Sequence, residues 1–221
     1  MTAELMKRAA NLDGLQSVRH GFFTRHADNC AYRTPDETDA VNAARSRCAA
    51  ALGVDVLITV KQRHTADVVM VEDGWAWHDA PVADAMVTRR RRVALGILTA
   101  DCAPVLLADP AAGVIGAAHA GWRGAVDGVI ANTLAAMVRA GAQSDRIFAA
   151  VGPCIGCASY EVGHNFRADF IARDPAYAAY FDISRTKPHF DLPRFVADCV
   201  RAAGVRDVLI QGADTLADEA D

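Results

Sequence analysis

The sequence predicts an α+β fold with mixed β-sheets and helices packed on the outside. Short apolar segments typical of strands arrive in groups along the chain and do not alternate strictly with helical segments. That order favours α+β over a doubly wound parallel sheet. Between Gly124 and Gly141, apolar residues recur at helical spacing on one face, which indicates an amphipathic helix packed against a sheet.

The composition excludes several classes of protein. The formal net charge is −4, so neither nucleic acid nor an anionic membrane surface is an expected partner. No apolar run approaches the ~18–20 residues that a membrane span needs, and residues 1–11 lack an apolar secretory core. We expect a cytoplasmic monomer that forms one domain over residues 1–221. Its six cysteines are not expected to form a disulfide framework.

The first part of the chain predicts a strand, a helix and a β-hairpin. Residues 18–24 alternate weakly between apolar and polar side chains, as a strand does. Residues 36–52 are rich in Ala and Arg, begin with acidic residues and are followed by Gly53, which is how helices begin and end. Residues 54–60 and 66–71 are β-branched runs on either side of a turn with His64, so we expect a hairpin.

The second part predicts another hairpin, followed by helices and strands. Residues 93–98, 105–108 and 114–118 are short apolar strands, with a strong turn signal at 109–113. The helix from near Gly124 ends at Gly141, and residues 147–151 form a buried strand. The remaining expected elements are helices at 164–172 and 192–203 and a last strand at 205–210.

Cys102 and His119 stand at the two ends of this second hairpin, and His64 stands in the turn upstream. Thiolate and imidazole are zinc ligands, and a catalytic zinc site uses three protein ligands with a fourth position open. Packing in the core is the alternative for a cysteine and for lone histidines. Two features favour the metal site: each residue lies at a strand end or turn, and Asp101 adjoins the cysteine.

Two glycine-containing turns are further candidates for ligand binding. Residues 119–124 lead from a strand into a helix, where backbone N–H groups and Arg123 would suit an anion. A plain strand-to-helix turn is the alternative, with Trp122 as packing. Residues 152–156, which include Cys154, either approach a ligand closely or make a tight turn.

Six sequence blocks occur in a fixed order: HGFFTR at 20–25, KQRH at 61–64, ADA at 83–85, TADCAPVLLAD at 99–109, HAGWRG at 119–124 and VGPCI at 151–155. In combination they resemble the YfiH-like family, also called the laccase-domain or multicopper polyphenol oxidase family. The resemblance implies that His64, Cys102 and His119 bind a metal ion, which we expect to be zinc, with copper as the other candidate.

The resemblance also implies an activity and a fold. Family members are described as purine nucleoside enzymes that phosphorolyse adenosine, inosine and methylthioadenosine and that deaminate adenosine. Small-molecule purine nucleosides and phosphate are therefore the expected partners. The implied fold is α+β and is similar to the catalytic domain of cytotoxic necrotizing factor.

This activity assigns expected roles to individual residues. Asp101, Cys102 and Arg123 are the catalytic candidates, with Asp101 as the acid that protonates the departing base. Arg25 and Arg123 are the candidates for a phosphate cradle. The full set of substrate-binding candidates is Arg25, Lys61, Gln62, Arg123 and Cys154.

Two family segments have no counterpart in the printed sequence. After Arg25 the family carries a Gly/Ser-rich loop, where this chain has only residues 26–34. The family also continues past its last strand into a phenylalanine- and arginine-rich segment, whereas this sequence ends at Asp221. Both segments border the pocket in the family, and neither touches the three metal-binding candidates.

Three other functions stay open on the sequence. Copper-dependent oxidation of phenols is one, although the chain has seven histidines and no His-x-His pair of the kind that true multicopper oxidases use. A metal-free hydrolase, similar to a deamidase, would use a Cys102 thiolate activated by His119. The last is a binding protein without enzyme activity.

Overall fold

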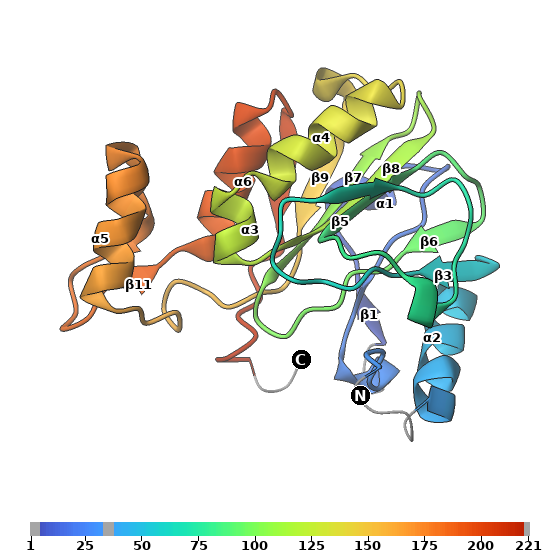
Figure 1. The fold of residues 1–221 in the computed structure, drawn as a ribbon, viewed down its shortest axis with the longest axis horizontal. Helices are drawn as coiled ribbons and strands as arrows, with labels where there is room; N and C mark the ends of the chain where they lie inside the picture. The colour runs from blue at the N-terminus through green and yellow to red at the C-terminus, as the bar shows by residue number, and fades with distance from the viewer. Residues whose placement is uncertain (1–4, 33–37, 219–221) are drawn as a thin grey trace.

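The computed structural model describes residues 5–32 and 38–218, and a six-stranded mixed sheet forms its centre (Figure 1). The strand order is β12-β9-β7-β8-β5-β4. β12 runs parallel to β9 and β4 parallel to β5, while the other neighbours are antiparallel. The bounds are β4 Val68–Met70, β5 Ala85–Thr88, β7 Ala103–Asp109, β8 Val114–Ala120, β9 Phe148–Val151 and β12 Asp207–Ile210.

Three two-stranded sheets surround the central one. β1 (Met6–Lys7) pairs with β2 (Phe22–Phe23), and β10 (Phe181–Asp182) pairs with β11 (His189–Phe190), both antiparallel. β3 (Val56–Ile58) and β6 (Val93–Leu95) form a parallel pair. The mixed sheets with outer helices confirm the predicted α+β class.

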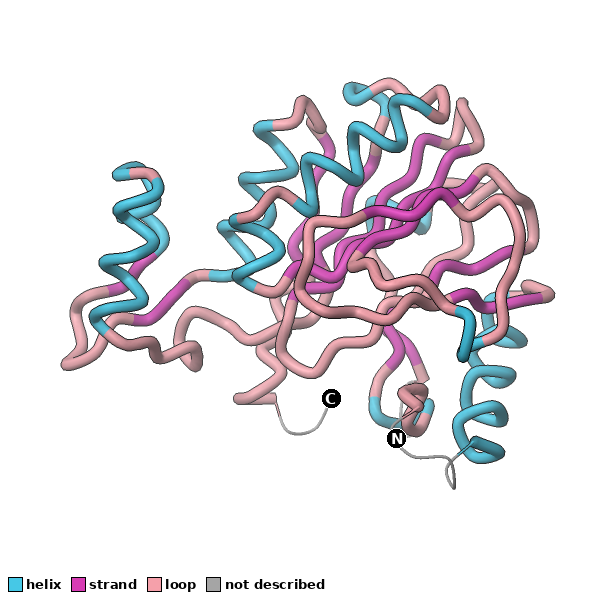
Figure 2. Tube along the Cα trace, in the orientation of Figure 1, coloured by secondary structure: helices cyan, strands magenta, loops and turns pink. Residues whose placement is uncertain are grey.

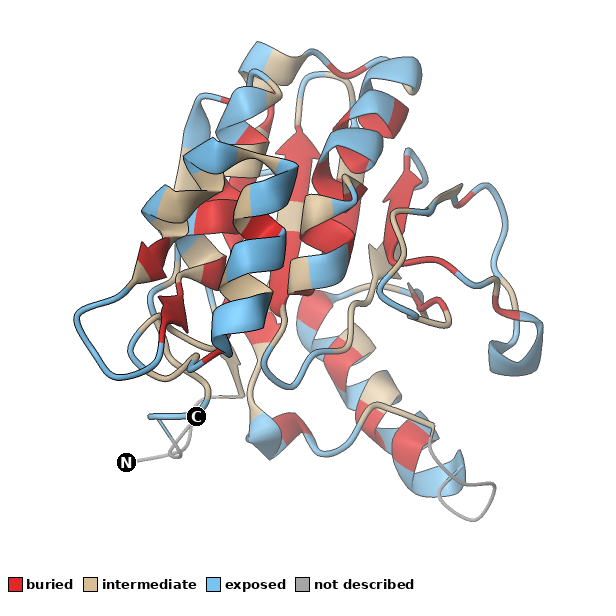
Figure 3. Cartoon of the chain, turned by 60° about the vertical axis from the view of Figure 1, so that its left-hand side comes forward, coloured by how far each residue is buried: buried red, intermediate tan, exposed pale blue. Residues whose placement is uncertain are grey.

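Helices cover the central sheet on both faces (Figures 1 and 2). Successive strand residues point to opposite faces, so Val105 and Leu107 of β7 join the core under α4 and α6, whereas Ala108 joins a second core with Leu12 of α1. Buried residues, red in Figure 3, follow the strands and the inward sides of the helices. The helices are α1 Ala10–Asp13, α2 Thr38–Leu52, α3 Trp122–Val126, α4 Val129–Arg139, α5 His164–Arg173 and α6 Leu192–Ala202.

Short 3-10 helices complete the fold, and they are η1 Arg25–Ala27, η3 Trp77–Asp79, η4 Ser144–Arg146 and η5 Pro175–Tyr180. Within the described residues, no helix combines the length and the apolar character that crossing a membrane requires. The single domain over residues 1–221 and the likeness to cytotoxic necrotizing factor stay predictions.

Most expected elements match the structure in kind and place. The hairpin of β7 and β8 is confirmed, with Ala103 opposite Ala120 and Asp109 opposite Val114. The predicted helix 36–52 is α2, of which residues 36 and 37 lie outside the described part. The strand expected at 18–24 is reduced to the two residues of β2.

The expected hairpin around His64 is wrong. β3 and β4 lie on either side of this turn, but β3 pairs with β6 and β4 pairs with β5, in different sheets and both in parallel. Two β-branched segments joined by a short turn have the sequence pattern of a hairpin, but here each segment pairs in parallel with a strand from another part of the chain. The strand β5 itself was not expected. It is only four residues long, and because all four are buried the segment shows no alternation of apolar and polar side chains.

The helix expected between Gly124 and Gly141 is two helices. α3 covers five residues and α4 begins at Val129. Gly128 between them has a φ of 99°, a left-handed conformation that ends a helix and that glycine adopts without steric penalty. The break lets α4 turn to lie across the sheet.

Asp109 fastens the β7–β8 hairpin to the segment around η4. Its fully buried carboxylate accepts hydrogen bonds from the backbone of Ala111, Ala112 and Gln143 and from the Arg146 guanidinium. Burial alone would raise the pKa of Asp109, but the hydrogen bonds from Gln143, Ala112 and Arg146 lower it below the usual value.

Asp109→Asn is expected to lower the free energy of unfolding by about 2–3 kcal/mol at pH 7, because charge-assisted hydrogen bonds are lost. The folded pKa lies below the unfolded value of about 3.9, so the carboxylate stabilises the fold fully above that pH and progressively less below it. Urea denaturation from pH 7 down to about 3 should show the wild type approaching the variant. The exposed Asp145 provides the control, Asp145→Asn. A constant gap across this range would contradict the assignment.

Candidate metal centre

The open end of the β7–β8 hairpin carries two of the three candidate ligands. Cys102 directly precedes β7, and His119 is the penultimate residue of β8, where it pairs with Pro104. Antiparallel register therefore places the thiol and the imidazole at the same end of the sheet. The juxtaposition predicted from sequence is confirmed.

His64 reaches this end from a strained turn before β4. Its φ of 59° is left-handed, a conformation that a non-glycine residue keeps only when its surroundings hold it. The buried Asp84 carboxylate does so by accepting hydrogen bonds from the backbone N–H groups of Arg63, His64 and Thr65, at 3.0, 3.0 and 2.6 Å. The Thr65 hydroxyl also donates to it, at 3.0 Å.

The same carboxylate orients His119. Asp84 directly precedes β5, whose Ala85 pairs with Ala118 of β8, so register brings the two side chains together. The Oδ1 atom of Asp84 lies 2.7 Å from Nδ1 of His119. Nδ1 is thereby held as the donor, and Nε2 is free of its proton and available as a ligand. Burial lowers the pKa of His119, only partly offset by Asp84, which keeps the imidazole neutral as a metal ligand must be.

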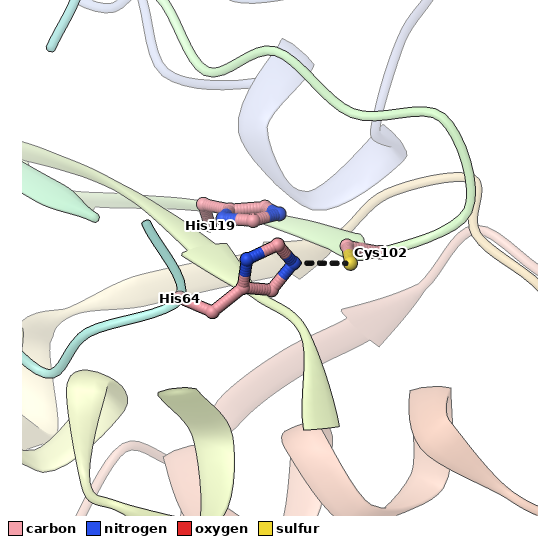
Figure 4. Close-up of side chains that lie close together, drawn as sticks. All are labelled: His64, Cys102 and His119. Atoms are coloured by element: carbon pink, nitrogen blue, oxygen red, sulfur yellow. Dashed lines mark hydrogen bonds between the residues drawn. The ribbon is translucent and has the colours of Figure 1, made fainter. Parts of the chain in front are cut away.

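The three candidate ligands face one another (Figure 4). Their donor atoms all lie within 4.8 Å of one another, and Cys102 Sγ is 3.7 Å from His64 Nε2. Nitrogen and sulfur bound tetrahedrally to one zinc ion at about 2.05 and 2.3 Å would be about 3.6 Å apart. The donor set fits zinc, and the Cys102–His64 pair already has the spacing that a common tetrahedral ion would require. Within the part of the chain that the structure describes, it is the one such cluster of His, Cys, Asp and Glu side chains.

The electrostatics around Cys102 suit a ligand better than a free nucleophile. Burial, with Asp101 and Asp84 nearby, raises the pKa of the Cys102 thiol. A reactive cysteine has the opposite shift, whereas a bound metal ion deprotonates a thiol outright. The thiol contacts His64, while His119 is engaged with Asp84. The alternative function, in which His119 activates a Cys102 thiolate, therefore finds no support in these contacts.

Gly121 allows the ligands to approach. A Cβ atom at this position would lie 2.7 Å from Cδ2 of His64 and 2.9 Å from Sγ of Cys102. Both distances are shorter than contacts between such atoms allow, so only glycine leaves room for the cluster.

The other two residues expected to be catalytic are close in sequence to the candidate ligands: Asp101 adjoins Cys102, and Arg123 follows His119 by four residues. Asp101 is exposed, and its Oδ1 accepts a hydrogen bond of 2.8 Å from the Thr215 hydroxyl. Arg123 is exposed on α3, with its guanidinium 5.3 Å from the centroid of the Trp122 ring. A helix begins after His119 as expected, but it is α3, which is only five residues long.

The other substrate-binding candidates divide into exposed and engaged side chains. Arg25 is exposed in η1. Lys61 donates to the carbonyl of His78 at 2.8 Å. Gln62 makes two hydrogen bonds to the backbone of Leu98, at 2.7 and 2.9 Å, and so fixes the segment leading to Cys102.

Cys154 is the buried member of the substrate-binding candidates. Its side chain is 2% exposed and belongs to the main core. Its backbone bonds to Ala213 and Thr215 hold the C-terminal segment beside Asp101. The thiol packs in the core and the glycine-bracketed loop makes a tight turn, so a contact of Cys154 with substrate stays a prediction.

Asp84 is the functional residue that the sequence reasoning missed. In the sequence it was noted only as part of the block ADA at 83–85, and no role was predicted for it. The available signal was a carboxylate between apolar residues, since an acidic side chain in a buried strand needs several hydrogen-bond donors.

Comparison with known proteins decides the family. The sequence model of the family described as multi-copper polyphenol oxidoreductase laccase matches residues 16–221. The chain belongs to this family. Its resemblance to YfiH-like proteins is confirmed by the crystal structure of the Bacillus licheniformis hypothetical protein YfiH, with a TM-score of 0.79, 25% sequence identity and coverage of 87% of this chain and 77% of that one.

Two relatives of this laccase-family chain carry names of purine enzymes. A Deinococcus radiodurans protein named purine nucleoside phosphorylase is 40% identical over 215 residues, which cover 93% of this chain and 81% of the relative. A protein named adenosine deaminase RL5, from an unknown prokaryotic organism, is 34% identical over 189 residues, covering 77% and 69%.

Gly121→Ala is expected to weaken zinc binding at least about tenfold while the fold persists, because the added methyl group displaces His64 and Cys102 from their common centre. Zinc content after dialysis against a graded chelator, measured by elemental analysis, checks this. Gly14→Ala is the matched control, since a Cβ there meets no described atom within 4 Å. Equal zinc retention by both variants would show that Gly121 does not govern the site.

Proposed function

We propose that this chain is a zinc-dependent purine nucleoside enzyme that phosphorolyses adenosine, inosine and methylthioadenosine and also deaminates adenosine. The observation that carries the proposal is the convergence of His64, Cys102 and His119, with Asp84 orienting one imidazole. The names of the relatives add the substrate class, purine nucleosides, and phosphate as the second substrate. We also expect the protein to act as a cytoplasmic monomer.

A zinc ion held by these residues would lower the pKa of a bound water toward about 7 and would act as a Lewis acid. The residues of the chain supply the framework. Asp84 fixes the tautomer of His119, and the turn held by the same carboxylate presents His64. Because His64 is exposed and Cys102 half-buried, the centre is accessible from solvent.

Phosphorolysis also needs an anion site and an acid for the departing base. We assign phosphate binding to Arg123, which follows His119 by four residues, and to Arg25. Both arginine side chains are exposed. We assign the acid role to Asp101, which adjoins Cys102 and is oriented by Thr215. Gln62 is assigned a positioning role, because its amide is bonded to the segment before Asp101.

Product analysis distinguishes the proposed activities. Adenosine with inorganic phosphate should give adenine and ribose 1-phosphate by phosphorolysis, and inosine by deamination. Chromatography of the reaction with zinc-loaded protein is expected to show both outcomes. Unchanged adenosine, inosine and methylthioadenosine would contradict the proposal and favour a binding protein.

His64→Ala is expected to lower zinc affinity and to reduce adenosine turnover by at least about 100-fold, since one of three ligands is lost. His78→Ala is the matched control, because the side chain of His78 is exposed and paired only with the neighbouring Asp79 in the described structure. Steady-state kinetics and elemental analysis on both variants check this. Full turnover with full metal content in His64→Ala would sink the assignment.

Copper-dependent phenol oxidation is the second candidate, favoured by the description of the family model and by a His/Cys donor set that copper also accepts. It would use the same three residues. Zinc-loaded and copper-loaded protein, each assayed on a phenol and on adenosine, separate the two functions. Adenosine turnover confined to the zinc form supports the primary proposal.

A further inference from the structure

Two cysteines outside the metal centre lie in contact. The Sγ atom of Cys30, in the segment that follows η1, is 3.8 Å from the Sγ atom of Cys48 on the buried face of α2. Both thiols are free. A disulfide joins sulfur atoms at about 2.05 Å, so the two sulfur atoms, already in contact, must move closer together for a bond to form.

Side chains of α2 hold the two thiols together. The Arg45 side chain donates to the carbonyl of Cys30 at 3.1 Å. Arg47 donates to the carbonyl of Ala27 at 3.4 Å and forms an ion pair with Asp28. The segment therefore lies along α2 through polar contacts of its own, and a covalent bond there would break no strand pairing.

The electrostatics make Cys30 the nucleophile of the pair. The hydrogen bond with Cys48 lowers the pKa of Cys30 to about 7, against burial, and Arg45 and Arg47 add to this while Asp28 opposes it. The same contact raises the pKa of Cys48. A large share of Cys30 is thiolate at neutral pH, and the thiolate is the form that attacks disulfides.

The other four cysteines have the opposite character. Burial raises the pKa of Cys154 to about 12 and that of Cys199 to about 11. The pKa values of Cys102 and Cys157 are also raised, mainly by burial. Cys30 is thus the thiol expected to react first with a mild oxidant.

We propose that Cys30 and Cys48 form a redox-modification site, at which a low-molecular-weight disulfide such as oxidised glutathione converts the two thiols into a reversible intramolecular disulfide. The Cys30 thiolate attacks the oxidant, a mixed disulfide forms and one glutathione thiolate leaves. Cys48 gives up its proton to that thiolate and attacks the Cys30 sulfur, and the second glutathione departs as a thiol on protonation by solvent. Two protein thiols are oxidised and one glutathione disulfide is reduced.

The bond would fasten the segment around Cys30 to α2 and close a loop between positions 18 residues apart. Arg25, assigned above to phosphate binding, lies at the start of the same segment. The redox site itself rests on the contact between the two thiols and is independent of the metal centre and of the proposed activity.

The test uses the full chain incubated with oxidised glutathione at pH 7.5 and then digested with trypsin without reduction. Free-thiol titration should fall from six to four, and mass spectrometry should find the peptide 26–33 joined to the peptide 48–61. Dithiothreitol should restore six thiols. Failure to find this cross-link, or a cross-link that joins other cysteines, would overturn the proposal.

Single-cysteine variants distinguish closure of the Cys30–Cys48 disulfide from reaction of one cysteine alone. Cys48→Ser is expected to stop at the mixed disulfide, with one glutathione on Cys30, and Cys30→Ser should leave Cys48 reduced. Cys157→Ser, which alters a half-exposed thiol elsewhere, should retain the 26–33/48–61 cross-link. Wild-type protein that accumulates glutathione on Cys30 without closing to Cys48 would also contradict the proposal.

Discussion

One buried carboxylate, that of Asp84, organises the functional end of this protein. A charged group removed from water is strongly unfavourable unless hydrogen-bond donors surround it. Here three successive backbone N–H groups, the Thr65 hydroxyl and the His119 imidazole all donate to Asp84. The need to satisfy this carboxylate holds the His64 turn in a left-handed conformation and fixes the tautomer of His119 in the same interaction.

The central sheet provides the rigid base for this arrangement. The register of β8 against β7 brings Cys102 to His119, and its register against β5 brings Asp84 to His119. Gly121 then leaves the space in which His64 and Cys102 can meet. The strand β8 thus carries His119, its neighbour β7 positions Cys102, and Asp84 before its other neighbour β5 positions His64. A metal site on such a rigid sheet keeps its donor atoms within a fraction of an ångström of the geometry that binding needs.

The sequence was sufficient to predict elements whose partners are close in the chain and whose local pattern is clear. The turn signal at 109–113 set the hairpin that joins Cys102 and His119, and the amphipathic spacing of α4 set the helix over the sheet. It was insufficient where pairing is non-local: β3 and β4 found parallel partners beyond their own turn, and the short buried β5 carries no periodicity. Asp84 was missed for the same reason, since its donors come from a distant turn and strand. The burial of Cys154 could not be predicted, because a glycine-bracketed loop has the same composition whether its cysteine packs inward or faces a ligand.

The dependence of the metal centre on Asp84 is the central claim, and zinc affinity measures it most directly. Competition titration against a chromophoric chelator should show Asp84→Asn binding zinc about 10–100-fold more weakly than the wild type, the usual effect of losing a carboxylate behind a ligating histidine. Asp67→Asn, at an exposed position directly before β4, should bind as the wild type does. A folded Asp84→Asn protein with unchanged zinc affinity would contradict the account.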